Sequence, residues 1–378
     1  MICVVNMNEA RQITSSVINL KKLVAVLLLG LLPGILISGS LSAAVILQYH
    51  HIRDTGPAAT RTSPELFRQH LEYLAKHNYQ VVELERLINA LKQKQPLPDK
   101  TVAITFDDGY DSIYHKALPE LKRRGWPFTV FINTQPIDER WQGFMSWDQL
   151  RELTESGVSI ANHSERHWHM QRRQEGENRE SWLQRLQAGI ETAEERIDDE
   201  LGQNYRWLAY PYGEYNREIQ DLLQQMGYVG LAQVSGPLAP WSDLTALPRF
   251  AFGGTYGDIN DFAIKVATQP FSLRRAWVTT ESGQRLSDPL LPLTESRPIL
   301  HLWLDNARIA AQVNCFASGQ GSIPVLRDGH QLQVQAPESL SVGRSRYNCT
   351  AATGEKGRFF WVSQPFWRRL EDGRWYSE

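Results

Sequence analysis

From Val45 to about residue 268, short apolar runs alternate with longer segments whose apolar positions recur with the spacing of a helix. The runs predict strands at 45–49, 79–82, 101–106, 128–132, 158–161, 206–210, 228–232 and 247–250. The intervening segments predict helices at 64–77, 83–92, 111–124, 146–156, 177–201, 214–226 and 258–268. Repeated strand–helix units of this kind are typical of an α/β fold with a parallel sheet, either open or closed into a barrel.

After about Phe271 the pattern changes to short strands separated by Gly, Pro, Asn and Asp, and helix signals are few. The strands expected there are 300–304, 310–315, 331–335 and 358–362. Because 378 residues exceed one average domain, we expect a larger domain at 45–275 and a β-rich accessory domain at 276–378. Its glycan-binding candidates, which could equally form its core, are Trp303, Trp361, Trp367 and Trp375. Contact with proteins of an export apparatus is a further alternative.

The N-terminal segment has the layout of a secretory signal. Lys21 and Lys22 precede an apolar run at 23–37, and small residues follow at 40–44. Glycines and a proline interrupt the run, which is also shorter than the roughly 20 residues that span a bilayer. We therefore expect 1–44 to be a cleaved signal peptide, with a retained membrane anchor as the alternative. Both place the remaining chain outside the cytoplasm, in the periplasm or secreted.

Cysteine usage agrees with export. Cys3 lies in the segment that cleavage would remove, which leaves Cys315 and Cys349. An even pair in an exported chain suggests one disulfide, and two unpaired thiols in a small β-domain are the alternative.

Composition narrows the class of partner. Apolar residues make up 42% of the chain and charged residues 22%, which is ordinary for a globular protein with a sizeable core. The net charge is -2 and no long basic run is present, so the sequence argues against a nucleic-acid partner.

Asp107 and Asp108 follow directly after the expected strand at 101–106. The carboxyl ends of parallel strands are where the active sites of α/β proteins collect. Two adjacent carboxylates repel each other unless a cation or a proton lies nearby, and Gly109 permits a tight turn. Asp-Asp-Gly is also a common surface turn, so this motif alone is weak evidence.

A second polar segment follows the expected strand at 158–161 and contains His163 and His167. On a helical turn, residues i and i+4 share one face and can reach the same metal ion. A pair of surface histidines is the alternative for this spacing taken alone. Because the carboxyl ends of parallel strands meet at one edge of a sheet, the Asp pair and the His pair together predict a metal site.

A third loop, Tyr210-Pro211-Tyr212-Gly213, follows the expected strand at 206–210 and opens an expected helix. Backbone N–H groups at the start of a helix could face an oxyanion. A plain Pro-Gly turn is the alternative.

Together, the segments 105–109, 163–167 and 211–213 resemble, in order and spacing, the motifs of the carbohydrate esterase family 4 deacetylases, which have the NodB-type fold. The resemblance covers about 45–275. It implies a distorted (β/α) barrel with a divalent metal, usually zinc, with cobalt, nickel or iron as alternatives.

The resemblance also implies roles for individual residues. Asp107 would be the general base, and the metal ligands would be Asp108, His163 and His167. One departure from the family is Ala209, which stands where an arginine is usual.

A second departure is that no late Leu-x-His motif supplies the general acid, because 247–250 reads Leu-Pro-Arg-Phe. However, 47–51 reads Leu-Gln-Tyr-His-His, which resembles a subgroup that acts on poly-N-acetylglucosamine. That subgroup has a circularly permuted barrel and a catalytic histidine near its N-terminus. We therefore expect His50 to be the acid, with His51 as second choice and a structural role for His50 as the alternative. Arg249 is expected to orient Asp107 in place of the missing arginine.

The predicted function is metal-dependent removal of N-acetyl groups from an exopolysaccharide of the poly-N-acetylglucosamine type, such as those of biofilms. In this hypothesis Asp107 takes a proton from water, the backbone N–H of Tyr212 helps to hold the oxyanion, and His50 donates a proton to the leaving amine. The alternatives are a polysaccharide O-acetyl esterase and a non-catalytic carbohydrate-binding protein on the same fold.

Overall fold

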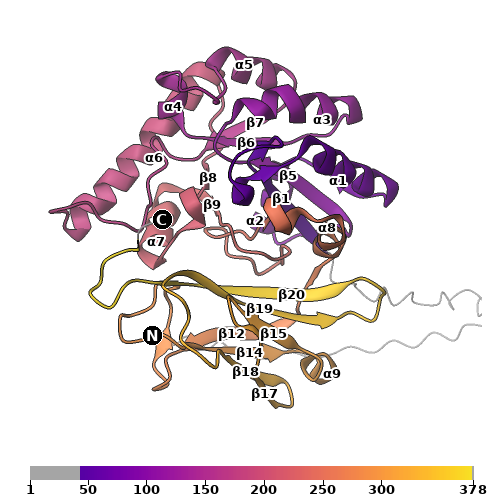
Figure 1. Cartoon of the computed structure of the whole chain (residues 1–378), viewed down its shortest axis with the longest axis vertical. Helices are drawn as coiled ribbons and strands as arrows, with labels where there is room; N and C mark the ends of the chain where they lie inside the picture. The colour runs from indigo at the N-terminus through magenta and orange to yellow at the C-terminus, as the bar shows by residue number, and fades with distance from the viewer. Residues whose placement is uncertain (1–42, 377–378) are drawn as a thin grey trace, which may run out of the picture. The chain divides into compact units, whose positions relative to one another are not determined.

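The computed structural model describes residues 43–376, and their first part forms a parallel sheet covered by helices (Figure 1). In space the strands run β10-β1-β5-β6-β7-β8-β9, and β4 also pairs with β5. Their bounds are β1 (Ala44–Tyr49), β4 (Gln80–Val81), β5 (Thr101–Phe106), β6 (Thr129–Ile132), β7 (Ser159–Asn162), β8 (Trp207–Ala209), β9 (Val229–Leu231) and β10 (Phe250–Ala251). A parallel bridge from Leu231 to Leu247 brings β9 beside the segment before β10, so the sheet curls toward closure. The predicted α/β fold with a distorted barrel is confirmed.

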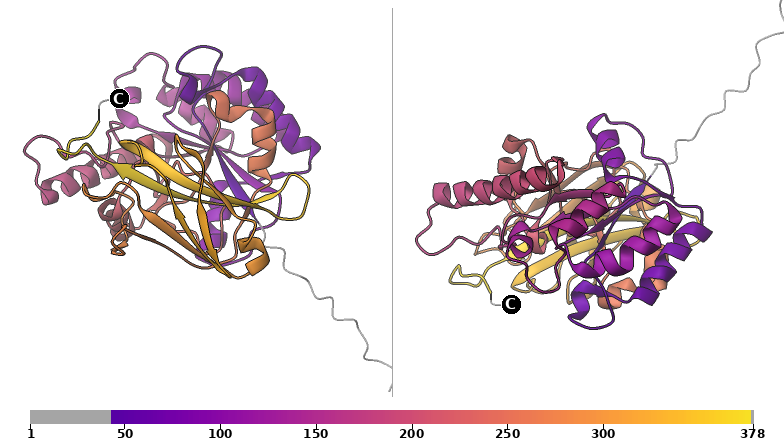
Figure 2. Two further views of the ribbon diagram at one scale, coloured as in Figure 1. Left: turned by 60° about the horizontal axis from the view of Figure 1, so that its bottom comes forward. Right: turned by 90° about the horizontal axis from the view of Figure 1, so that it is seen from above.

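Helices lie along the outer side of this sheet, except the helix at Leu84–Lys92, whose buried side chains pack with Ala44 and Ile46 on the other face (Figure 2). They are α1 (Pro64–Lys76), α2 (Leu84–Lys92), α3 (Leu118–Arg124), α4 (Thr134–Asp138), α5 (Trp147–Glu155), α6 (Arg179–Leu201), α7 (Arg217–Met226) and α8 (Ile259–Val266). Capping explains their ends, because the Ser63 side chain accepts from the backbone of Leu66 at the start of α1. Gly125 ends α3 in the left-handed region, at a φ of 64°. Apart from α4, each of these helices was predicted.

Two elements differ from their prediction. The expected helix at 111–124 begins as a π-helical turn, Ile113–Ala117, because Pro119 has no N–H and its ring would clash with the carbonyl of His115 in a regular helix. The expected strand at 247–250 is reduced to β10 and the single bridge of Leu247.

Side chains along the strands alternate between two apolar clusters. In β1, Val45 and Leu47 pack with the outer helices, whereas Ala44 and Ile46 join a cluster to which the neighbouring strands also contribute. Gln48 follows the parity of that second cluster. The alternation therefore carries a polar side chain to the carboxyl end of a buried strand, on the inner face of the barrel.

The C-terminal part consists of two five-stranded sheets, ordered β11-β20-β19-β15-β16 and β13-β12-β14-β18-β17. Their bounds are β11 (Gln269–Pro270), β12 (Leu273–Thr279), β13 (Arg285–Leu286), β14 (Ile299–Leu304), β15 (Asn314–Ala317), β16 (Gly321–Ile323), β17 (Val325–Asp328), β18 (Gln331–Gln335), β19 (Gly343–Ala352) and β20 (Phe359–Arg368). The predicted β-rich character is confirmed. The division at residue 275 stays a prediction, and β11 lies before that boundary although it pairs with β20.

The expected strand at 310–315 is wrong. Its first residue ends the short helix α9 (Ala307–Ala310), because the Asn306 side chain accepts hydrogen bonds from the backbone N–H groups of Arg308 and Ile309. Cys315 lies in β15 opposite Cys349 in β19, and the two form a disulfide. The bridge suggested by the cysteine count is therefore present.

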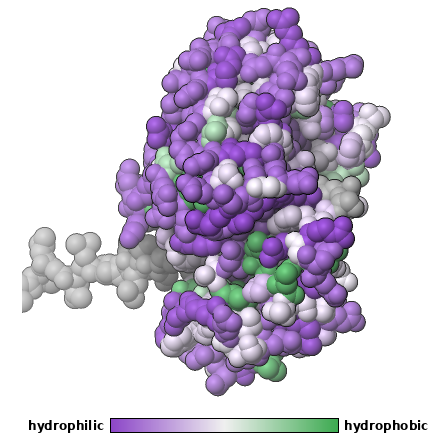
Figure 3. All heavy atoms as spheres, turned by 90° about the vertical axis from the view of Figure 1, so that its left-hand side faces the viewer, coloured by the Kyte–Doolittle hydropathy of each residue, from purple (hydrophilic) through white to green (hydrophobic). Residues whose placement is uncertain are grey.

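The C-terminal sheets lie beside the α/β part (Figure 1), and buried side chains from both pack in one cluster. Trp367 of β20 is completely buried in a cluster with Tyr210, Tyr215 and Ile219 of the α/β part. Trp361 packs its ring against Phe250, with ring centroids 5.4 Å apart. Of the four tryptophans considered for glycan binding, Trp367 is therefore a core residue. The face in Figure 3 is largely hydrophilic, with hydrophobic side chains gathered in its lower half.

The predicted signal segment, 1–44, lies almost entirely outside the described residues. Between residues 43 and 376, no helix combines the length and the apolar character that crossing a membrane requires.

Candidate metal centre

The carboxyl ends of β1, β5, β7 and β8 meet at one edge of the parallel sheet. Asp107 and Asp108 follow β5, His163 follows β7, and the Tyr212 loop follows β8. His50 follows β1, which pairs directly with β5. The predicted site residues therefore come from neighbouring strands although they are far apart in the chain.

Asp108, His163 and His167 form a compact donor set. The Oδ1 atom of Asp108 lies 3.1 Å from Nε2 of His163 and 3.3 Å from Nε2 of His167. One ligand atom from each residue lies within 4.8 Å of the others. Among the described residues, this buried oxygen has no partner in hydrogen-bond geometry. An oxygen that faces two imidazole nitrogens without a hydrogen bond fits a shared divalent cation, and this donor set suits zinc.

The loop that carries the histidines is not the helical turn that the sequence predicted. Ser164 and His167 have φ angles of 67° and 55°, in the left-handed region. The Asn162 side chain accepts from the backbone of Ser164, and the Ser164 hydroxyl accepts from the backbone of His167. Such side-chain turns compete with a regular helix, so this loop brings the two rings together by another route.

The partner of His163 defines its tautomer. Its Nδ1 lies 2.8 Å from the carbonyl oxygen of Ala209, which can only accept a hydrogen bond. Nδ1 therefore carries a proton, which leaves Nε2, the nitrogen that faces Asp108, as the one that can bind a cation. Ala209 is the position where the family arginine is missing, and its carbonyl orients the metal-ligand candidate His163.

Asp107 is buried beside Arg249, as the sequence analysis expected. The two groups form a bidentate pair, with Nη1–Oδ1 at 2.7 Å and Nη2–Oδ2 at 2.8 Å, and Arg249 is 0% exposed. Burial opposes ionisation of Asp107, but the Arg249 guanidinium together with the nearby His163 and His50 outweighs it, so the pKa of Asp107 is lowered. Sequence reasoning missed Gln48, whose Nε2 donates to Asp107 Oδ2 at 2.6 Å. A glutamine inside an apolar strand was the signal that could have found it.

The two candidate acids differ in environment. His50 is half-buried and lies close enough to Asp107 and Asp108 that its charge lowers the pKa of both. His51 is buried and stacks on Tyr110, with ring centroids 3.4 Å apart. Burial lowers the pKa of His51 to about 4, so this ring is neutral near pH 7. A neutral imidazole is a poor proton donor, which argues against His51 as the acid.

The Tyr212 loop also differs from its prediction. Pro211–Gly213 forms a 3₁₀ turn, and α7 begins only at Arg217, because Asn216 caps it. Tyr212 has a φ of 57°, and its ring stacks on His169, with centroids 3.7 Å apart. The same ring lies 4.5 Å from that of the metal-ligand candidate His167.

Two further residues near the site were missed. Burial and the neighbouring Asp108 carboxylate raise the pKa of Tyr110, which follows Gly109 in the turn after β5. Arg344, from β19 of the C-terminal part, donates to the Tyr212 carbonyl. Neither the effect of Asp108 on Tyr110 nor the hydrogen bond from Arg344 to Tyr212 can be predicted from the spacing of motifs along the chain.

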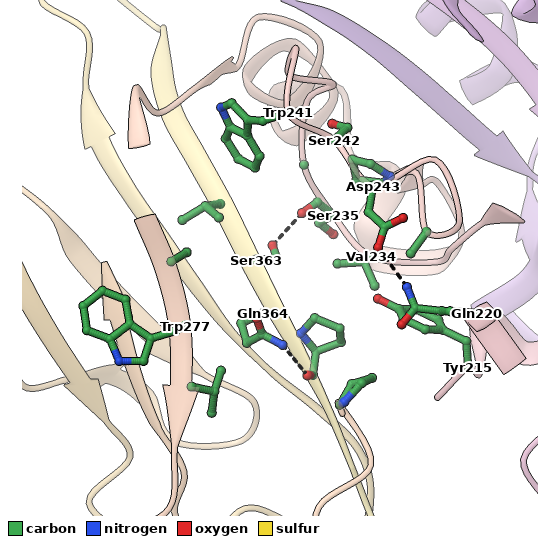
Figure 4. Close-up of a pocket in the computed structure, with 18 of the residues that line it drawn as sticks. Tyr215, Gln220, Val234, Ser235, Trp241, Ser242, Asp243, Trp277, Ser363 and Gln364 are labelled. Atoms are coloured by element: carbon green, nitrogen blue, oxygen red, sulfur yellow. Dashed lines mark hydrogen bonds between the residues drawn. The ribbon is translucent and has the colours of Figure 1, made fainter. Parts of the chain in front are cut away.

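A cavity of about 390 Å³ lies apart from the metal-ligand candidates (Figure 4). It lies between the loop that carries Trp241 and Asp243 and strands β12 and β20. Neither a carboxylate nor an imidazole of the candidate metal centre lines it.

A family model described as polysaccharide deacetylase matches residues 94–231. The poly-β-1,6-N-acetyl-D-glucosamine N-deacetylase of Escherichia coli (strain K12) is 26% identical over 263 residues, which cover 59% of this chain and 38% of that protein. The protein of the same name from Staphylococcus epidermidis is 26% identical over 230 residues, which cover 55% of this chain and 78% of that protein. The structure of IcaB from Ammonifex degensii superposes with a TM-score of 0.51 at 25% identity, covering 57% of this chain and 94% of that one.

The matched stretch contains the Asp pair after β5, both histidines after β7 and the Tyr212 loop, whereas His50 and Arg249 lie outside it. The fold, the Asp108–His163–His167 donor set and the similar proteins all indicate the same family. The chain belongs to the polysaccharide deacetylase family of enzymes.

Proposed function

We propose that this chain is a metal-dependent hydrolase that removes N-acetyl groups from an exopolysaccharide of the poly-N-acetylglucosamine type. The convergence of Asp108, His163 and His167 on one buried oxygen carries the proposal. The printed names of the relatives from E. coli and S. epidermidis support this substrate class. Because the match spans only part of the E. coli protein, the substrate remains a proposal here.

Asp108, His163 and His167 would hold one divalent ion, zinc before cobalt, nickel or iron. Three protein ligands leave coordination positions open, and an ion bound there polarises a carbonyl group and lowers the pKa of water. Ala209 would support this ligand set through its hydrogen bond to His163.

Asp107 would act as the general base. Arg249 and Gln48 fix the orientation of its carboxylate and keep it anionic. Each carboxylate oxygen has two lone pairs. Oδ2 already accepts from Arg249 and Gln48, whereas Oδ1 accepts only from Arg249 among these donors and can accept a further hydrogen bond while that contact persists. Asp107 can therefore receive a proton from the attacking water without leaving its position.

His50 would donate a proton to the departing amine, because it lies near both carboxylates at the end of β1. The backbone N–H of Tyr212 would donate to the oxyanion as the carbonyl carbon becomes tetrahedral. Tyr212 is held beside His167 by ring contacts, which supports this placement.

We also propose that the chain acts outside the cytoplasm. The Cys315–Cys349 disulfide and the predicted signal segment support export. Association with a membrane through the N-terminus and contact with export-apparatus proteins remain predictions from the sequence.

The substrate test measures acetate released by the zinc-loaded protein from β-1,6-linked and β-1,4-linked N-acetylglucosamine oligomers and from an O-acetylated polysaccharide. We expect the fastest release from the β-1,6-linked oligomers. Faster release from the O-acetylated polymer would replace the proposal by an esterase. No release from any of the three in the presence of zinc would favour a carbohydrate-binding protein.

A further inference from the structure

A side chain of the C-terminal sheets reaches the edge of the parallel sheet at which the candidate metal centre lies. Arg344 lies in β19, and its Nη1 donates to the Tyr212 carbonyl and to Gln233 Oε1, the latter at 3.2 Å. Gln233 follows β9, so a single guanidinium nitrogen contacts the loops after two adjacent strands of the parallel sheet. The accessory part therefore contacts the backbone of a candidate catalytic loop.

The backbone that Arg344 contacts is in a conformation that needs support. Tyr212 has a φ of 57°, a region that an aromatic L-residue rarely adopts. Next to it, Gly213 has a φ of 70°, and a Cβ at Gly213 would lie 2.4 Å from that of Gln233. The turn is therefore pressed against the loop after β9, and the surrounding contacts determine its peptide orientation.

A change in the conformation of Tyr212 would affect groups of the proposed active site. Its ring lies between His169, on which it stacks, and the metal-ligand candidate His167. His169 in turn lies 3.1 Å from the buried carboxylate of Glu214, which fixes the far side of this stack. The carbonyl that Arg344 contacts belongs to the peptide after Tyr212, and the Tyr212 N–H belongs to the peptide before it. The φ and ψ angles of Tyr212 link the two peptides, so a change in this conformation would turn the Tyr212 N–H away from the place where an oxyanion forms.

The strand that carries Arg344 is itself fixed to the α/β part. In the β19–β20 register, Arg344 pairs with Trp367, whose buried ring packs edge-on against Tyr215 at 4.9 Å. Farther along β20, the Ser363 hydroxyl donates to the carbonyl of Ser235 at 2.5 Å (Figure 4). These contacts anchor β20 to the α/β part, and β19 is paired with β20. The strand that carries Arg344 is therefore fixed relative to the Tyr212 carbonyl.

We propose that Arg344 is a positioning residue: by holding the Tyr212 carbonyl, it lets the C-terminal sheets keep the backbone of Tyr212 in the conformation that directs its N–H to the oxyanion. The inference rests on the proposed function, because it assigns the Tyr212 N–H to the oxyanion. It gives the β-rich part a role in turnover that does not depend on binding a glycan.

The test compares Arg344→Met, which keeps the apolar stem but removes the donor, with Arg344→Lys, which keeps a cationic donor. The matched control is Arg275→Met, which removes an exposed arginine of β12 whose guanidinium lies 5.1 Å from the centre of the Trp277 ring. For each protein, kcat and KM for acetate release, zinc affinity and hydrogen exchange of the segment 210–216 are measured with zinc present.

Arg344→Met should lower kcat about ten-fold while KM and zinc affinity stay within about two-fold, because only the orientation of a donor to the oxyanion is lost. Exchange of 210–216 should rise in this variant, Arg344→Lys should fall between it and the wild type, and Arg275→Met should match the wild type. A merely structural role would lower kcat in step with zinc affinity or with the folded fraction, and that result would overturn the inference.

Unchanged kcat and unchanged exchange in Arg344→Met would also overturn it. If the wild type released no acetate, the proposed function would fail by itself. The exchange of 210–216 would then still decide whether Arg344 holds the loop, since that readout does not depend on turnover.

Discussion

At the scale of single residues, two adjacent carboxylates acquire different chemistry from their surroundings. Asp107 faces Arg249 and Gln48, whereas Asp108 faces two imidazole rings. The first is held as a hydrogen-bonded anion, and the second is the metal-ligand candidate. Separate environments for neighbouring acids are a recurrent way to assign separate catalytic roles.

The Asp107→Asn variant tests this division. An amide has nearly the same shape but cannot take a proton from water, so turnover should fall by about 10²–10⁴-fold. Zinc affinity should stay near that of the wild type, because Asp107 is not among the ligands. Acetate release and a zinc titration measure the two effects, and near-full activity would show that another group is the base.

The Arg249–Asp107 pair also predicts a stability effect. Arg249→Met leaves the Asp107 charge buried without its partner, which should lower the free energy of unfolding by about 3–5 kcal/mol. Adding Asp107→Asn to that variant should recover part of the loss, because the unpaired charge is removed. Urea unfolding of the wild type, the two single variants and the double variant gives a double-mutant cycle. If the losses in unfolding free energy of the two single variants simply add in the double variant, Arg249 and Asp107 do not interact.

The sequence predicted which residues meet where motifs follow strand ends, and the roles of these residues stay predictions. The donor set and the contact between Arg249 and Asp107 were both expected. Arg344 and its contact with Tyr212 were not, because a side chain from a different sheet makes that contact and no spacing along the chain encodes it.

At the scale of elements, periodicity predicted the strands of the parallel sheet and most of the helices. It failed where side chains bond to the local backbone. Asn162 and Ser164 turn the histidine loop away from a helix, and Asn306 begins α9 where a strand was expected. Long strands such as β19 were missed because only alternate residues are buried and these include Gly343 and Ser345, so the segment has no apolar run.

Helix α1 carries a buried histidine that makes stability depend on pH. His70 Nε2 lies 2.7 Å from the Gly257 carbonyl, and Nδ1 lies 3.0 Å from the Tyr49 hydroxyl, which suits a neutral ring. Burial lowers the pKa of His70 to about 4 from 6.5, which corresponds to about 3 kcal/mol at roughly 1.4 kcal/mol per pH unit.

The sign follows from proton binding. Between pH 6.5 and about 4 the unfolded chain binds a proton at His70 that the folded chain does not, so stability is full above pH 6.5 and falls as the pH drops. In His70→Gln this fall should be smaller, though not abolished, since the pKa of His51 is lowered to the same range. Unfolding free energies at pH 7 and pH 5 measure the difference, and an identical fall in the variant would contradict the assignment.

At the scale of the whole molecule, the β-rich part is packed into the α/β part by buried aromatic residues. Trp367 is 0% exposed and belongs to the same cluster as Tyr210 and Tyr215. Trp367→Ala should therefore lower the free energy of unfolding by about 3–5 kcal/mol. The half-buried Trp375, changed to Ala, is the matched control and should cost less; equal losses would contradict a core role for Trp367.

The central claim is that one divalent ion, held by Asp108, His163 and His167, drives deacetylation. Its most direct test is a zinc titration of metal-free protein, followed by acetate release from N-acetylglucosamine oligomers. The account predicts that activity is absent without metal and reaches its maximum at one ion per chain, and that Asp108→Ala neither binds the ion tightly nor turns over. Full activity in the metal-free protein or in Asp108→Ala would contradict it.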